Sequence, residues 1–153
     1  MTREELIENA AKLPKPSPEA AREYDSVRER AADAVTGELA RRDDLEALIG
    51  KGNSEMMSQN HRNHALFMSS MFAGYDPRVF VETILWVFRA YRSHGFGLTY
   101  WPAQLDSWLS VLGDLMGEQA FGEIKPFYEW MLVNQAAFAN LSDACLGESH
   151  VEH

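Results

Sequence analysis

The chain has 153 residues, with 14 Lys and Arg against 23 Asp and Glu, which gives a formal net charge of −9. This length corresponds to one domain, and 46% hydrophobic with 24% charged residues is ordinary for a globular protein and excludes a wholly disordered chain. The acidic balance, without any basic block, argues against nucleic acid or an anionic membrane as the partner.

Every segment that can be interpreted is helical, because β-branched residues are sparse and no strand-like alternation is present. N-cap side chains, prolines in first turns and glycines at the ends indicate the boundaries. The expected helices cover approximately residues 2–12, 17–42, 43–49, 53–74, 76–93, 101–117 and 118–144.

The N-terminal boundaries are the most clearly marked. Thr2 and Glu5 form a capping box for the first helix. Three prolines within residues 13–18 then force an extended hinge, and Ser17 caps the long second helix. We therefore expect an N-terminal helix and hinge at residues 1–16.

The remaining boundaries predict one all-α domain of six to seven helices at residues 17–146. Asp76 followed by proline is a strong helix start. Pro126 either sits in the first turns of the last helix or kinks it. The tail, residues 147–153, resembles the remnant of an expression tag, so His150 and His153 are set aside.

Three successive segments carry apolar residues at helical intervals, which predicts mutual packing around one core. The residues at these intervals are Phe80, Ile84, Val87, Phe88 and Tyr91; Leu105, Trp108, Leu109, Leu112, Leu115 and Met116; and Ile124, Phe127, Tyr128, Met131, Gln135 and Phe138.

His61 and His64 lie three residues apart and share one helix face with Met57, Met68 and Phe72. That face is expected to be buried. One interpretation is a partly buried pair that is hydrogen-bonded to neighbouring side chains. The other is a metal ligand or distal donor that points into a pocket lined by Met and Phe.

His94 ends the helix that also carries Phe88 and Tyr91. As a cation at a helix C-terminus it would be favoured by the helix dipole. Because it shares a face with Tyr91, it is equally a candidate axial ligand. Spacing does not separate these interpretations.

The aromatic residues are unusually dense, with eight Phe, five Tyr and four Trp, nearly all after residue 66. Buried indole and phenol groups need hydrogen-bond partners. A core rich in such groups, together with histidines and methionines, suits the pocket of a flat aromatic ligand.

No catalytic apparatus is visible, and no enzymatic turnover is expected. The chain lacks a His-Glu-x-x-His helix, a phosphate-binding glycine loop and a nucleophile elbow. The single cysteine, Cys145, forms no internal disulfide and has no histidine nearby in the sequence that would activate it. No apolar run is long enough to span a membrane and no leader opens the chain, so a cytoplasmic location is expected.

The order of the later elements resembles bacterial globins over most of residues 24–142. The ranges that resemble the G helix and the turn after it are 100–102, 105–112 and 115–118, and those that resemble the H helix are 124–130 and 135–138. Residues 39–49 are similar to the end of a B helix that runs into a C helix.

This resemblance implies a haem pocket between the helices at residues 53–74 and 76–93. His64 would be the distal histidine and His94 the metal ligand, although an ungapped count places Tyr91 in the proximal position. The phenylalanine that usually wedges haem falls on Ile49. The implied cofactor-binding residues are His64, Met68, Phe72, Phe88, Tyr91, His94 and Trp108.

Two functions follow from the resemblance. The first is a sensory domain that binds haem and a diatomic gas. The second is a haem-free signalling or interaction module, with an apolar ligand or none, that acts by forming a homodimer or by contacting a partner signalling domain. A helical-bundle adaptor unrelated to globins is a third interpretation.

Overall fold

The structure, a computed structural model, describes the backbone of residues 1–151 and the side chains of residues 1–143. This part of the chain is all-α, with eight helices and no strand. The helices are α1 (Arg3–Ala10), α2 (Pro18–Ala40), α3 (Leu45–Ile49), α4 (Ser54–Ala73), α5 (Pro77–Ser93), α6 (Tyr100–Leu115), α7 (Glu118–Val133) and α8 (Gln135–Val151).

Side-chain caps start three of these helices at the predicted places. The Thr2 hydroxyl accepts a hydrogen bond from the Glu5 backbone amide at 3.1 Å. The Ser17 hydroxyl does the same at the start of α2, and the Asp76 carboxylate accepts from two amides at the start of α5. Each cap satisfies amides that the first turn leaves without a partner.

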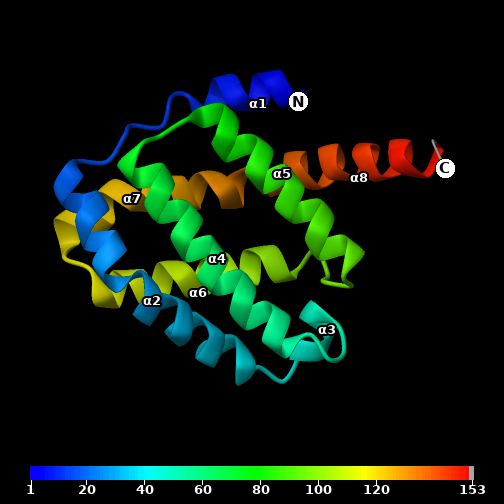
Figure 1. The fold of residues 1–153 in the computed structure, drawn as a ribbon, viewed down its shortest axis with the longest axis horizontal. Helices are drawn as coiled ribbons and strands as arrows, with labels where there is room; N and C mark the ends of the chain where they lie inside the picture. The colour runs from blue at the N-terminus through cyan, green and yellow to red at the C-terminus, as the bar shows by residue number, and fades with distance from the viewer. Residues whose placement is uncertain (152–153) are drawn as a thin grey trace.

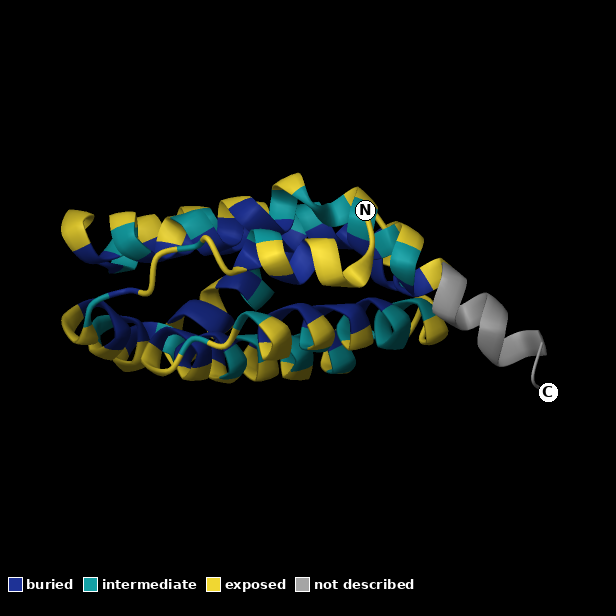
Figure 2. Ribbon diagram, turned by 90° about the horizontal axis from the view of Figure 1, so that it is seen from above, coloured by how far each residue is buried: buried dark blue, intermediate teal, exposed yellow. Residues whose placement is uncertain are grey.

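The helices form two layers whose buried residues face each other (Figure 2). The long helix α2 packs against α4, α6 and α7, while α5 packs against α1 and α8 (Figure 1). Large side chains from distant segments meet in the core between them, where Phe80, Trp108 and Phe127 are completely buried.

The last predicted helix is wrong in one respect, because it is two helices in the structure. The chain breaks at Asn134, whose side chain donates a hydrogen bond to the Trp130 carbonyl at 2.9 Å. Asn side chains compete with the backbone for such carbonyls. Pro126, expected either in the first turns or at a kink, lies in the interior of continuous α7. Residues 1–151 therefore contain eight helices, one more than the seven ranges expected from the sequence.

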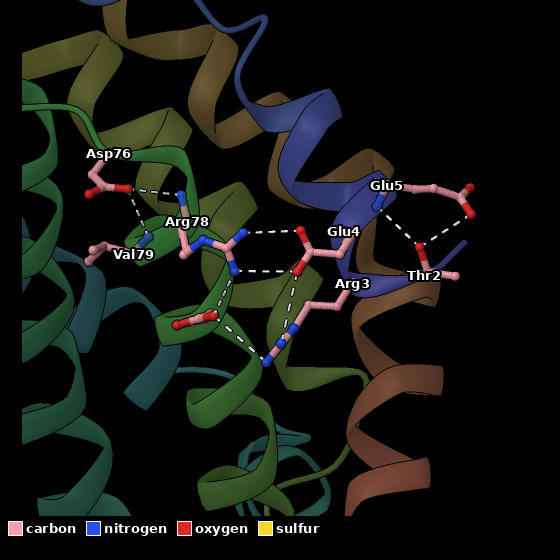
Figure 3. A network of polar contacts seen from close by, with 8 residues as sticks. Thr2, Arg3, Glu4, Glu5, Asp76, Arg78 and Val79 are labelled. Atoms are coloured by element: carbon pink, nitrogen blue, oxygen red, sulfur yellow. Dashed lines mark hydrogen bonds and ion pairs between the residues drawn. The ribbon is translucent and has the colours of Figure 1, made fainter.

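Helix α1 is joined to α5 by exposed ion pairs. Figure 3 shows the Arg78 guanidinium directed at the Glu4 carboxylate, at 3.0 Å, with Arg3 beside them. Two less exposed hydrogen bonds also hold α1: Trp130 Nε1 donates to Asn9 Oδ1 at 2.7 Å, and the Tyr75 hydroxyl donates to the Ala10 carbonyl at 2.6 Å. The N-terminal helix is thus packed on the body of the domain.

Among the helices described, none combines the length and the apolar character needed to cross a membrane.

Candidate functional site

A cavity of about 340 Å³ lies between α4 and α5. Trp101 of α6 and Met131 of α7 also line it, and the indole of Trp101 donates a hydrogen bond to the Met131 carbonyl at 3.5 Å. Most of the lining is apolar or aromatic. The lining residues are Met56, Asn60, Asn63, His64, Phe67, Met68, Thr83, Ile84, Trp86, Val87, Ala90, Tyr91, His94, Trp101 and Met131.

Four of the residues predicted for a cofactor site line this cavity: His64, Met68, Tyr91 and His94. The other three lie outside the lining, in the packed core. The Phe72 ring contacts Tyr24 and Phe127, the Phe88 ring contacts Trp101 and Phe138, and the Trp108 ring contacts His64 at 4.8 Å between centroids.

His64 connects the cavity to the far side of the core. Its Nε2 atom lies 3.0 Å from the Tyr128 hydroxyl, which lies 2.7 Å from the Tyr24 hydroxyl. Both tyrosines are completely buried, whereas His64 is half-buried and lines the cavity. The three side chains, which we call the His64–Tyr128–Tyr24 chain, run from α4 through α7 to α2.

His61 is a core residue. Its ring is completely buried, with Nδ1 at 2.7 Å from the Thr36 hydroxyl and Nε2 at 2.8 Å from the Tyr100 hydroxyl. Both ring nitrogens are therefore occupied, which leaves none for a metal. The interpretation of a hydrogen-bonded ring therefore applies to His61. Its partners lie on α2 and α6, however, and not among the neighbouring residues of its own helix.

Burial keeps both histidines neutral. Loss of hydration lowers the pKa of His61 to about 4, with a smaller contribution from the Arg62 charge. Burial likewise lowers the pKa of His64 to about 3, with a smaller contribution from His61. At neutral pH each ring therefore carries one N–H donor and one acceptor nitrogen.

Tyr91 and His94 form the end of the cavity at the last turn of α5. The Tyr91 ring stacks on Phe96 at 5.2 Å and meets the Tyr100 ring edge-on at 5.4 Å, and burial raises the pKa of its hydroxyl. The His94 ring is exposed, but its backbone is held in place, since its carbonyl accepts a hydrogen bond from Asn53 Nδ2 at 2.8 Å.

In donor chemistry, the cavity fits a haem group. Imidazole and phenolate are both haem-iron ligands. His94 supplies an imidazole beside an apolar wall, whereas Tyr91 supplies a phenol whose pKa is raised by burial and which would have to lose its proton to bind iron. No Lys or Arg lines the cavity to pair with the carboxylates of a haem. Within the described side chains, no three His, Cys, Asp or Glu residues gather as a metal cluster.

A second hollow, of about 430 Å³, lies between the start of α2 and α4 and opens more widely to solvent. It is lined by Lys15, Arg22 and Asp25 together with prolines and Leu66, and it contains neither a histidine nor a tyrosine. The Asp25 carboxylate is already paired with the Arg28 guanidinium, with 2.9 Å between Oδ1 and Nε. The α4–α5 cavity is therefore the stronger candidate site.

Sequence reasoning did not identify several residues of the site. Tyr24 and Tyr128 are far apart in the sequence, and only the general need of buried phenols for partners pointed to them. Trp86, expected in the core with the other tryptophans, is 64% exposed at the cavity rim. Adjacent residues of a helix point about 100° apart, so Trp86 lies on a different side of α5 from the buried Leu85.

Comparison with known proteins finds no family model, no curated relative and no solved structure that matches this chain.

Proposed function

We propose that this chain is a globin-like sensory domain that binds a small, flat, largely apolar ligand between α4 and α5. The α4–α5 cavity is the observation that carries the proposal. Its volume lies within the range of small-molecule sites, and its walls are apolar with a few polar groups. The proposed role is binding, without catalytic turnover.

Haem, with a diatomic gas, is the specific ligand that the resemblance to globins favours. His94 would hold the iron, with Tyr91 as the alternative, and His64 would face the gas. When bound, haem supplies an iron centre with an open position for a diatomic molecule. Phe67, Met68 and the other apolar residues of the lining would keep water away from the bound gas.

A route for the signal exists in the polar core. The His64–Tyr128–Tyr24 chain begins at the cavity and ends on α2. Helix α2 packs against α4, α6 and α7, so a ligand that moves His64 would alter a hydrogen bond in a chain that ends on a helix contacting three others.

Titration with haemin tests the haem proposal. We expect a Soret band in the wild type and in Ser93→Ala, whose hydroxyl bonds only to the Arg89 carbonyl. His94→Ala should shift or abolish the band, because it removes the proposed iron ligand at an exposed position that the fold does not need. Absence of any band in the wild type would reject haem. An unchanged band in both His94→Ala and Tyr91→Phe would assign the iron to another residue.

The second candidate is a haem-free module that acts by dimerisation. It is favoured by large apolar side chains that stay exposed on α4 and α5: Leu66 is 54% exposed, Val79 43% and Trp86 64%. Exposed apolar groups of this size are common at protein interfaces when they form a continuous patch. The net charge of −9 opposes self-association at low salt.

Light scattering tests dimerisation. If the module acts as a homodimer through Trp86, the wild type should be dimeric at micromolar concentration and Trp86→Ala should be monomeric or at least tenfold weaker, because Trp residues carry much of the energy of interfaces. Val133→Ala, at an 80% exposed position of α7, is the control and should leave the dimer intact. A strictly monomeric wild type would contradict this candidate.

A further inference from the structure

The hydrogen atoms of the His64–Tyr128–Tyr24 chain can be assigned by counting donors and acceptors. Each tyrosine has one hydroxyl hydrogen, and neutral His64 has one N–H. Buried donors are rarely left without an acceptor. Among the described side chains, the Tyr24 hydroxyl has one partner, Tyr128, and Tyr128 has two, Tyr24 and His64.

Only one donor-to-acceptor order along the His64–Tyr128–Tyr24 chain gives each buried hydroxyl hydrogen an acceptor. If Tyr24 donates to Tyr128 and Tyr128 donates to His64 Nε2, both hydroxyl hydrogens are bonded. If His64 Nε2 instead carried the hydrogen and donated to Tyr128, one tyrosine hydroxyl would be left without an acceptor, in a position with no solvent exposure. An orphaned buried donor of this kind is costly.

The hydrogen of the neutral imidazole then sits on Nδ1. Nδ1 has no hydrogen-bond partner among the described residues. The fully buried side-chain atoms without a partner are Arg89 Nε and Gln104 Nε2, so Nδ1 of His64 is not fully buried. Since His64 lines the cavity, the accessible edge of its ring offers Nδ1–H there. His61 and Tyr100 are already bonded to each other and do not compete for it.

We propose that Tyr128 is the specificity-determining residue of the cavity: it holds His64 as an Nδ1–H donor, so the cavity selects flat apolar ligands that carry a hydrogen-bond acceptor such as a ketone or quinone oxygen. The ligand preference rests on the proposed binding function of the cavity, whereas the tautomer does not. A ligand without an acceptor would bury the Nδ1–H unpaired.

The tautomer is measured directly from the ¹⁵N chemical shifts of the His64 ring. In the wild type we expect a pyrrole-type Nδ1 and a pyridine-type Nε2. Tyr24→Phe should keep this pattern, because Tyr128 then has His64 as its one remaining acceptor. Tyr128→Phe removes the donor to Nε2 and should produce a mixture of tautomers. A pyrrole-type Nε2 in the wild type overturns the proposal, whether or not either variant folds.

Ligand selection is tested with fluorene and fluorenone, two flat molecules that differ by one carbonyl. Quenching of tryptophan fluorescence reports their binding, since Trp86 and Trp101 line the cavity. We expect fluorenone to bind about tenfold more tightly than fluorene to the wild type and to Tyr24→Phe. His64→Leu, which removes the donor and keeps an apolar side chain, should bind both equally.

The outcomes separate the two proposals. Equal binding of fluorene and fluorenone to the wild type overturns the selection of acceptor-bearing ligands and leaves the cavity as a binding site. Failure of both probes to bind overturns the binding function together with its selectivity. In that case the ¹⁵N shifts still decide the tautomer on their own.

Discussion

Replacing Trp108 with alanine is expected to lower the free energy of unfolding by about 3–5 kcal/mol. The side chain is completely buried, and its ring lies 4.8 Å from the His64 ring and 6.3 Å from the Tyr128 ring. Its indole N–H donates to Gln104 Oε1 at 3.1 Å, so the substitution also leaves the buried amide oxygen of Gln104 without this donor. Urea unfolding followed by circular dichroism measures the loss.

Trp86→Ala is the matched control for this experiment. The same residue type is removed, but from a position that is 64% exposed. We expect a change within about 0.5 kcal/mol, as for most surface substitutions. A similar loss of stability in both variants would mean that Trp108 does not occupy the centre of the core.

Stability is expected to fall as the pH is lowered from about 6.5 towards 4. Burial lowers the pKa of His61 to about 4 and that of His64 to about 3. In the unfolded chain both rings have the ordinary histidine pKa of about 6.5. Between these values the unfolded state binds protons that the native state does not, so the free energy of unfolding decreases as the pH falls.

For His61 the loss is about 3 kcal/mol over the whole window, at about 1.4 kcal/mol per pKa unit. His64 adds to it in the same direction. Carboxyl groups with a lowered pKa contribute mainly below about pH 5, where the unfolded chain begins to protonate them. These are Glu4, Asp25, Asp44 and Glu123, stabilised in the ionised form chiefly by hydrogen bonds with Arg78, Ser69, Arg42 and Ser17.

Urea unfolding at several pH values between about 7.5 and 5 therefore isolates the histidines. We expect His61→Gln to reduce the slope of stability against pH by about half, because His64 remains. His94→Gln changes an exposed ring and is the matched control, for which the wild-type slope should persist. An unaltered slope in His61→Gln would show that this ring is accessible to protons in the native state.

The predicted helix boundaries were largely correct where a capping residue marks them. Ser17 and Asp76 cap α2 and α5 as expected, since an N-cap depends on residues within one turn of the chain. The expectation of a single last helix failed for a related reason. Asn is found both within helices and at their ends, so the residue type alone did not show that the backbone at Asn134, with φ −99° and ψ 11°, would end α7.

The candidate site was predicted only in part. The pattern of apolar residues placed His61 and His64 on one buried face, and the structure agrees for the face as a whole. It did not show that His61 would be enclosed between Thr36 and Tyr100 while His64 reached a cavity. One helical turn separates the two histidines, and their surroundings are set by other helices. The assignment to globins and the identity of the ligand stay predictions.

By itself, the sequence determined that the protein is all-α, where most helices begin and which faces are apolar, because capping and periodicity act over a few residues. The tertiary structure decided which polar groups meet. Tyr24 and Tyr128 are 104 positions apart, yet their hydroxyls lie 2.7 Å from each other. A contact of this kind depends on how α2 and α7 cross, and no local pattern records that crossing.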